Sequence, residues 1–155
     1  EVVPVPAAYT VIIDYAHTPD ALENILTTVR DLTDRRVICL FGCGGDRDRS
    51  KRPAMGSIAA ALADICVVTS DNPRTEEPVA IIADILKGME GTDTPVRVEP
   101  DRRAAIRLAL SEAGTGDVVV LAGKGHETYQ EIDGVQFHLD EREEVAGFFA
   151  RGRRG

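Results

Sequence analysis

The sequence predicts an α/β fold built on a doubly wound, mostly parallel sheet, and three observations predict it. Short apolar runs rich in β-branched residues recur along the chain. Stretches with the 3.6-residue apolar period of amphipathic helices lie between these runs. Runs and stretches alternate at the spacing of βαβ units, which is typical of a parallel sheet. The expected strands cover residues 11–13, 37–41, 65–69, 96–98 and 118–121.

Four of the intervening segments are expected to be helices. The first follows Thr18-Pro19, a pair suited to the N-cap and the first helical position. The alanine-rich second segment has small side chains that permit close approach to a sheet, and Asp101 precedes the last segment as a candidate N-cap. The apolar stripes of these helices cover residues 21–32, 55–63, 79–89 and 106–113.

The end of the chain departs from the βαβ pattern. Residues 128–132 and 135–139 flank Asp133-Gly134, which is a two-residue turn signature for a β-hairpin. We expect this hairpin to add antiparallel pairing at the C-terminal edge of a Rossmann-like sheet, before a final helix over 141–149. One domain over 1–150 and a short, basic, disordered tail over 151–155 are expected.

Composition limits the classes of partner. The net charge of −8 argues against nucleic acid or an anionic membrane as a partner, and no apolar run approaches the roughly 20 residues of a membrane-spanning helix. Cys39 and Cys66 lie inside apolar strands and are expected to be core thiols, whereas Cys43 is expected to be more exposed. No cysteine or histidine spacing predicts a metal site. These features favour the reducing cytoplasm.

Four loops rich in polar residues follow four of the predicted strands. Because the carboxyl ends of parallel strands share one edge of the sheet, all four loops are expected at the same rim, where ligands of open α/β sheets bind. This convergence is stronger support for a site than any single motif. The loops cover residues 14–20, 42–53, 71–74 and 123–127.

The second loop has two interpretations. Its glycines permit close backbone approach, and its arginines and lysine favour anion binding. Alternatively it is a solvated loop in which Asp46 and Asp48 pair with neighbouring arginines. The chain has no GxxxxGK[ST] loop and no GxGxxG after the first strand, so neither common nucleotide-binding fingerprint is present.

The third loop predicts recognition of an amino acid. Asn72 is held extended by the proline that follows it, and Arg74 carries a planar fork of donors suited to a carboxylate. Arg47 and Arg74 with Asn72 can hold a carboxylate, while Glu127 and Asp71 can hold an ammonium group. That pairing suits a zwitterionic head group, and a ligand without the carboxylate would leave buried arginines unpaired.

Other loop residues are candidates with open roles. Gly123 and Gly125 could bring their backbones close to a ligand, and Lys124 and His126 could act as general acid or base groups. His17 either braces its turn or contacts a phosphate near a helix N-terminus.

These residues make the chain resemble the C-terminal domain of Mur ligases, in particular the branch that adds meso-diaminopimelate. The matching segments lie in the same order along most of the chain, and Asp-Asn-Pro-Arg is that branch's amino-acid recognition motif. They are Asp14-Tyr15-Ala16-His17-Thr18-Pro19-Asp20, Phe41-Gly42-Cys43-Gly44-Gly45-Asp46-Arg47-Asp48, Asp71-Asn72-Pro73-Arg74 and Gly123-Lys124-Gly125-His126-Glu127-Thr128-Tyr129-Gln130.

The resemblance implies an ATP-dependent amide ligase of peptidoglycan synthesis. ATP would phosphorylate the D-glutamyl γ-carboxylate of UDP-N-acetylmuramoyl-L-alanyl-D-glutamate, and meso-diaminopimelate would attack the acyl phosphate. The resemblance places Asp14 and His17 near the nucleotide. It also implies that meso-diaminopimelate is bound by Arg47, Asp71, Asn72, Pro73, Arg74, Gly123 and Glu127.

The resemblance further implies that this chain is one part of a three-domain enzyme. ATP and Mg²⁺ would be bound mainly by a central domain, which is expected to be a partner together with an N-terminal domain for the UDP-substrate. The chain has no initiator methionine and is expected to be an excised module, inactive alone. Alternatives are a non-catalytic ligand-binding module, the C-terminal domain of a folylpolyglutamate synthase, and a generic nucleotide-binding Rossmann protein.

Overall fold

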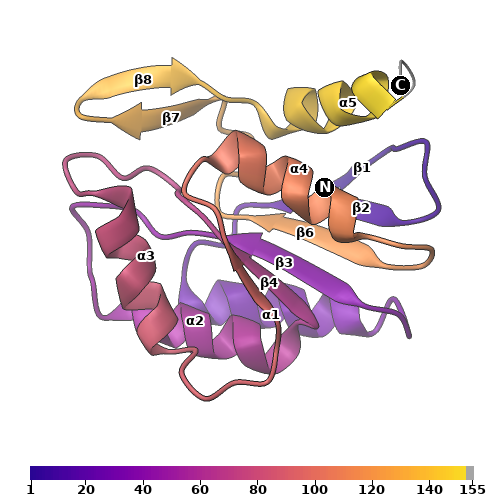
Figure 1. Ribbon diagram of the computed structural model, residues 1–155, viewed down its shortest axis with the longest axis horizontal. Helices are drawn as coiled ribbons and strands as arrows, with labels where there is room; N and C mark the ends of the chain where they lie inside the picture. Colours follow the sequence, from indigo (N-terminus) through magenta and orange to yellow (C-terminus); the bar gives the residue numbers. More distant parts are fainter. Residues whose placement is uncertain (153–155) are drawn as a thin grey trace.

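A computed structural model describes residues 1–152 and shows a mixed sheet of six strands (Figure 1). The strand order is β1-β2-β6-β3-β4-β5, and all neighbours pair in parallel except β1, which runs antiparallel to β2. The doubly wound α/β fold is thereby confirmed. The strands are β1 (Val2–Val3), β2 (Thr10–Asp14), β3 (Val37–Phe41), β4 (Ile65–Val68), β5 (Val96–Val98) and β6 (Val118–Ala122).

Helices cover both faces of this sheet. Helices α1 (Pro19–Arg30), α2 (Lys51–Leu62) and α3 (Pro78–Lys87) lie on one face, and α4 (Arg102–Glu112) and α5 (Glu141–Gly152) lie on the other (Figure 1). Because successive side chains of a strand point to opposite faces, each central strand supplies both cores. In β3, Cys39 and Phe41 belong to the core under α1 to α3, whereas Ile38 and Leu40 belong to the core under α4 and α5.

The helix predictions were right in position and wrong at two residues. Thr18 caps α1, its hydroxyl accepting a hydrogen bond from the N–H of Ala21 at 3.2 Å, and Asp101 caps α4. Leu32 was assigned to the buried stripe of α1, but the helix ends at Arg30 and Leu32 is 67% exposed. Val79, in the first turn of α3, is 65% exposed.

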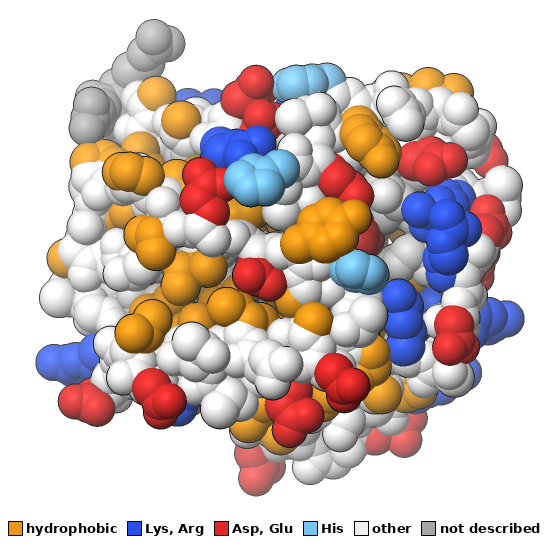
Figure 2. Space-filling view, turned by 180° about the vertical axis from the view of Figure 1, so that it is seen from behind, with side chains coloured by type: hydrophobic (Ala, Val, Ile, Leu, Met, Phe, Trp, Pro, Cys, Tyr) orange, Lys and Arg blue, Asp and Glu red, His pale blue; other side chains and the backbone are white. Residues whose placement is uncertain are grey.

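The short strand β1 was not predicted. Val2 and Val3 pair with Ile12 and Val11 at the edge of the sheet, and the prolines that follow limit the strand to two residues. The apolar residues of this segment reach the surface beside α5 (Figure 2), where a groove of about 230 Å³ is lined by Val3, Pro4, Pro6, Arg142, Val145, Ala146, Phe149 and Ala150.

The predicted hairpin forms from β7 (Tyr129–Ile132) and β8 (Val135–His138), but it does not join the main sheet. Its backbone instead bonds to the loop after β4: the N–H of Arg74 donates to the carbonyl of Glu131 at 3.1 Å, and the N–H of Asp133 donates to the carbonyl of Arg74 at 2.8 Å. The expectation that the hairpin extends the sheet edge was therefore wrong. The hairpin instead packs on the loop over residues 71–74 and holds it by these backbone hydrogen bonds.

The C-terminal helix is anchored by a buried ion pair. Nε of Arg102 lies 3.0 Å from Glu141, and both side chains are fully buried. The same guanidinium donates to the carbonyls of Ser70 and Ala122, just beyond β4 and at the end of β6. Helix α5 includes Arg151 and Gly152 of the expected tail, and residues 153–155 of that tail lie outside the described part.

No helix in residues 1–152 is both long and apolar enough to cross a bilayer.

Candidate amino-acid-binding site

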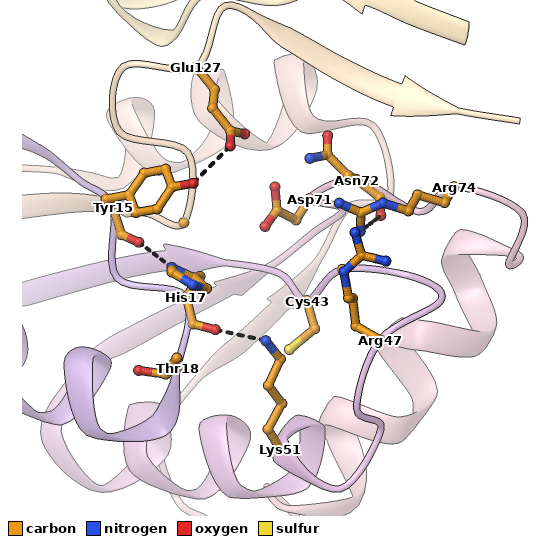
Figure 3. Close-up of a pocket in the computed structure, with 12 residues that line it drawn as sticks. Tyr15, His17, Thr18, Cys43, Arg47, Lys51, Asp71, Asn72, Arg74 and Glu127 are labelled. Atoms are coloured by element: carbon orange, nitrogen blue, oxygen red, sulfur yellow. Dashed lines mark hydrogen bonds between the residues drawn. The ribbon is translucent and has the colours of Figure 1, made fainter. Parts of the chain in front are cut away.

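A cavity of about 350 Å³ lies at the carboxyl ends of β2, β3, β4 and β6 (Figure 3). Each of the four predicted loops contributes to it, so their convergence at one rim is confirmed. The lining residues are Tyr15, His17, Thr18, Cys43, Gly44, Arg47, Lys51, Asp71, Asn72, Arg74, Gly123 and Glu127.

Asp14 and Pro73 lie outside the lining. The carboxylate of Asp14 accepts a hydrogen bond from the N–H of Ala16 at 2.9 Å and so braces the loop that carries His17. Pro73 packs its carbonyl against Gly45. Lys124, Gly125 and His126 also lie outside the lining, and the other predicted residues line the cavity.

Arg74 is held in position by two loops and the hairpin. Its φ of 53° lies in the left-handed region, which is uncommon for a residue with a side chain. Its guanidinium Nη1 donates to the carbonyl of Gly45 at 2.9 Å, and Nε lies 3.4 Å from the Glu131 carboxylate. The hairpin bonds to its backbone from both sides, which maintains the strained conformation.

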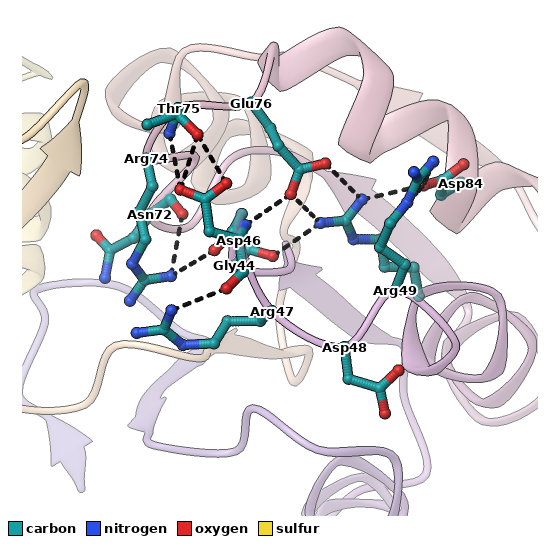
Figure 4. A network of polar contacts seen from close by, with 12 residues as sticks. Gly44, Asp46, Arg47, Asp48, Arg49, Asn72, Arg74, Thr75, Glu76 and Asp84 are labelled. Atoms are coloured by element: carbon teal, nitrogen blue, oxygen red, sulfur yellow. Dashed lines mark hydrogen bonds and ion pairs between the residues drawn. The ribbon is translucent and has the colours of Figure 1, made fainter.

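Arg47 lies beside Arg74 with few partners of its own (Figures 3 and 4). Within the described residues its guanidinium donates one hydrogen bond, to the carbonyl of Asp46 at 2.9 Å, and makes no ion pair. A Cβ on Gly44 would lie 2.9 Å from Nη1 of Arg74 and 3.7 Å from Cγ of Arg47, so both side chains pass over this glycine. Two neighbouring guanidinium groups repel each other unless an anion lies between them.

The alternative interpretation of the second loop, with Asp46 and Asp48 paired to arginines, was wrong. The Asp46 carboxylate accepts from the hydroxyl of Thr75 at 2.7 Å (Figure 4). Asp48 accepts from the hydroxyl of Ser50 at 2.7 Å. The Asp46 contact ties the second loop to the third. Arg47 is thereby left available to a ligand.

The glycines of the second loop serve close packing rather than a phosphate cradle. A Cβ on Gly42 would lie 2.3 Å from the carbonyl oxygen of Thr69, and one on Gly45 would lie 1.9 Å from that of Pro73. The N–H of Gly45 also donates to the carbonyl of Asn72 at 2.8 Å. Only residues without a side chain allow these two loops to touch along their backbones.

We expect Gly45→Ala to destabilise the protein by about 1–3 kcal/mol, because the new methyl group would overlap the Pro73 carbonyl and force the two loops apart. Thermal unfolding measures the effect. Gly147→Ala is the matched control, since nothing lies within 4 Å of its Cβ position on α5; it should be neutral or slightly stabilising. Equal melting temperatures for the two variants would contradict the packing argument.

The side of the cavity opposite the arginines is anionic. Asp71 is 8% exposed, and Glu127 accepts a hydrogen bond from the hydroxyl of Tyr15 at 3.2 Å (Figure 3). The negative charge of Glu127, together with this hydrogen bond, raises the pKa of Tyr15. Gly123, with φ of 117°, brings its backbone against the Asp71 carboxylate. Cationic and anionic groups therefore face one space.

The two candidate proton-transfer residues lie outside the lining. Lys124 is fully buried behind Asp71 and Asn72. The side chain of His126 is 79% exposed, and its Nδ1 accepts a hydrogen bond from the Arg142 guanidinium at 2.7 Å, away from this cavity. Gly125 also lies outside it and packs against Tyr15. Neither Lys124 nor His126 contacts the space in which a ligand would lie.

His17 lies at the cavity and is held by its own loop. Its Nδ1 lies 2.9 Å from the carbonyl of Tyr15, and the two rings meet edge to face with centroids 5.0 Å apart. The ammonium group of Lys51 donates to the carbonyl of His17 at 3.0 Å, which links the first loop to α2.

Sequence reasoning did not select five of the lining residues: Tyr15, Thr18, Cys43, Gly44 and Lys51. Tyr15 and Lys51 stand inside loops that were singled out, so proximity to the strand ends could have identified them. Cys43 was expected to be more exposed, but it is 2% exposed and its thiol lies 3.6 Å from the sulfur of Met55. Burial raises the pKa of Cys43 to about 12, so the thiol is protonated.

A buried arginine stabilises the loops beneath the cavity. Arg52 on α2 is fully buried and bonds to Glu76 at 2.6 Å, to Asp84 at 3.0 Å and to the carbonyl of Gly44 at 3.1 Å. Glu76 in turn accepts from the N–H of Asp46 at 2.7 Å (Figure 4). The hydrogen bond from Arg52 is the main reason that the pKa of Glu76 is lowered.

This network predicts a loss of stability in acid. Burial of Asp84 opposes its ionisation, but hydrogen bonds from Arg52, Lys87 and Arg49 outweigh that effect and lower its pKa to about 2. Because the folded pKa is below the ordinary value of 3.8, the stabilisation is present above about pH 4 and is lost as the pH falls towards about 2.

We therefore expect Asp84→Asn to be less stable than the unmodified protein at neutral pH, with the difference shrinking between about pH 4 and pH 2. Urea unfolding across this range measures it. The exposed Asp93→Asn variant should follow the unmodified protein throughout. A stability difference for Asp84→Asn that is independent of pH would contradict the assignment.

The described residues contain no group of three or more His, Cys, Asp or Glu side chains placed to hold a metal ion. The sequence also has no GxxxxGK[ST] loop for nucleotide phosphates.

Comparison with known proteins agrees with this geometry. The family described as "Mur ligase, glutamate ligase domain" matches residues 1–125. The UDP-N-acetylmuramoyl-L-alanyl-D-glutamate–2,6-diaminopimelate ligase of Syntrophomonas wolfei is 58% identical over 146 residues, which are 94% of this chain and 30% of that protein. A solved structure of a ligase of the same name superposes with a TM-score of 0.94 at 42% identity, covering 99% of this chain and 31% of the other.

More distant structures share the fold alone. A folylpolyglutamate synthase of Mycobacterium tuberculosis superposes with a TM-score of 0.59 at 22% identity, covering the whole of this chain and 31% of its own. The chain thus spans about 30% of the length of its similar relatives. With most of its residues matched, the chain belongs to the Mur ligase family, as its glutamate ligase domain.

Proposed function

We propose that this chain is the amino-acid-binding domain of an ATP-dependent ligase that adds meso-diaminopimelate to UDP-N-acetylmuramoyl-L-alanyl-D-glutamate in peptidoglycan synthesis. The observation that carries the proposal is one cavity with arginines on one side and carboxylates on the other. The names of the relatives that match most of the chain support the same substrate.

In this proposal the arginines select the ligand's carboxylate. Arg74 and Arg47 lie together at the cavity, so their guanidinium groups can clasp one carboxylate, with Asn72 beside them. Asp71 and Glu127 accept the ammonium group of the same head. If lysine reacted through its α-amine, its other end would bring an amine but no carboxylate to this pocket, and Arg47 would be left without an anion. This favours diaminopimelate over lysine.

Diaminopimelate has two amino-acid head groups, so binding one leaves the other amino group to react. That amine would attack the acyl phosphate formed by ATP on the D-glutamyl γ-carboxylate, making the amide bond and releasing phosphate. We assign the nucleotide phosphates and Mg²⁺ mainly to the rest of the enzyme; the sequence has no GxxxxGK[ST] loop of its own. His17 at the cavity, braced by Asp14 through its loop, is the residue proposed to lie near the nucleotide.

The full-length enzyme is proposed to contain two further domains. Because the chain spans about 30% of its relatives, we propose that an N-terminal domain and a central ATPase domain are its partners and that it does not turn over alone. We place the enzyme in the cytoplasm; three cysteines without disulfide bonds are consistent with a reducing compartment.

The test is substrate-dependent ADP release by the full-length protein. Release should require the UDP-substrate and meso-diaminopimelate together, and L-lysine at the same concentration should support far less. The 155-residue chain, given all three substrates, should release none. Equal rates with lysine would refute the assigned amino acid, and ADP release by the isolated chain would refute the division of labour between domains.

A further inference from the structure

Lys124 is the one lysine in the described residues that is fully buried, and it does not line the cavity. Its ammonium group donates to Oδ1 of Asn72 at 2.9 Å and to the carbonyl of Tyr129 at 2.9 Å. It lies 3.5 Å from the Glu127 carboxylate and 3.2 Å from that of Asp71, the latter without hydrogen-bond geometry. With these partners, the buried ammonium group of Lys124 is held in one position behind the cavity.

These contacts favour a fixed structural position for Lys124. An ammonium group has three N–H donors, and here they point to the Asn72 oxygen, the Tyr129 carbonyl and the Glu127 carboxylate. All of these partners belong to the protein. Lys124 therefore acts on a ligand through these partners and not by direct contact.

The effect of Lys124 on Asn72 is to orient its amide. Oδ1 of Asn72 accepts from Lys124 and from the backbone N–H of Glu131, each at 2.9 Å. Because only the oxygen of an amide group accepts hydrogen bonds, two donors at this end assign the oxygen to it and the NH₂ group to the other end. The Asn72 NH₂ group makes no hydrogen bond within the described residues and lies at the cavity that also contains Arg47 and Arg74.

We propose that Lys124 is a positioning residue that turns Asn72 into a hydrogen-bond donor facing the ligand carboxylate. This inference rests on the proposed function, because the ligand concerned is the head group of meso-diaminopimelate. From behind the cavity the same ammonium group offsets the repulsion between Asp71 and Glu127, so both carboxylates can face the ligand's ammonium group.

The isosteric variant Asn72→Asp tests the orientation by the sign of its effect. One carboxylate oxygen would keep the bond to Lys124, and the other would face the ligand carboxylate and repel it. We expect KM for meso-diaminopimelate in the full-length enzyme to rise by about 10- to 100-fold. If Asn72 instead offered its oxygen to the ligand's ammonium group, this variant would leave KM unchanged or lower it, and the proposal would be overturned.

Variants at Lys124 test its part directly. Lys124→Met removes the donor and should raise KM for meso-diaminopimelate by about 10- to 100-fold while KM for ATP and for the UDP-substrate stay unchanged. Lys124→Gln keeps a neutral donor and should raise it less. Lys87→Met, at an exposed lysine on α3, is the matched control and should leave all three constants unchanged.

The double variant tests whether Lys124 acts through Asn72. Asn72→Asp should cost less in the Lys124→Met background than alone, because the donor is already partly lost. Independent, multiplying effects, or an equal rise of all three KM values, would refute the positioning role. If Lys124→Met does not fold, Lys124→Gln and Asn72→Asp still decide. An unmodified enzyme that does not use meso-diaminopimelate would refute the proposed function instead.

Discussion

Replacing Arg74 by alanine in the full-length enzyme is expected to lower kcat/KM for meso-diaminopimelate by about 30- to 1000-fold. The side chain of Arg74 is only 18% exposed, so a ligand carboxylate at this position would lose a desolvated, charge-assisted partner. The loss should fall on meso-diaminopimelate and hardly on L-lysine, so the discrimination between the two should shrink. Competition assays with both amino acids measure this ratio.

Three further variants separate binding from structure. Arg47→Ala should act in the same direction with little effect on folding, since the guanidinium of Arg47 bonds only to the Asp46 carbonyl within the described residues. Arg74→Lys keeps the charge without the planar fork and should recover part of the loss. Arg97→Ala removes an exposed ion pair with Glu112 away from the cavity and should change nothing. An unaltered ratio in Arg74→Ala would contradict the site.

Glu141→Ala is expected to reduce the free energy of unfolding by about 3–5 kcal/mol, the largest stability effect that the structure predicts. The change would leave the Arg102 guanidinium charged, fully buried and without its carboxylate. Because that guanidinium also bonds to the chain beyond β4 and at the end of β6, the strand ends beneath the site should loosen together. Chemical denaturation measures the loss.

Two variants control for this effect. Glu143, on the same helix as Glu141, makes an exposed contact with His138 of β8; Glu143→Ala breaks it and should cost less than about 1 kcal/mol. The double variant Arg102→Met/Glu141→Leu replaces the buried pair by apolar side chains and should recover much of the stability lost in Glu141→Ala. If Glu141→Ala and Glu143→Ala were equally stable, the buried pair would have no anchoring role.

Local patterns were enough to locate the elements and the rim of the site. Strands β3 and β5 begin and end where their apolar runs do, and α1 starts at its Thr18-Pro19 cap, because these signals depend on neighbouring residues alone. The four polar loops met at one edge because every parallel strand ends there. The motif in the third loop supplies one residue to each charged side of the cavity, Arg74 and Asp71.

Contacts between distant segments decided the rest. The place of the hairpin depends on bonds between β7 and the loop after β4. Cys43 is buried because its side chain packs with Met55 of α2 in the core under α1 to α3. Lys124, Arg52 and Arg102 look like surface residues in the sequence, yet each is fully buried among partners from other elements. A charge can be buried only where the fold brings its partners, and no local pattern records where those partners will be.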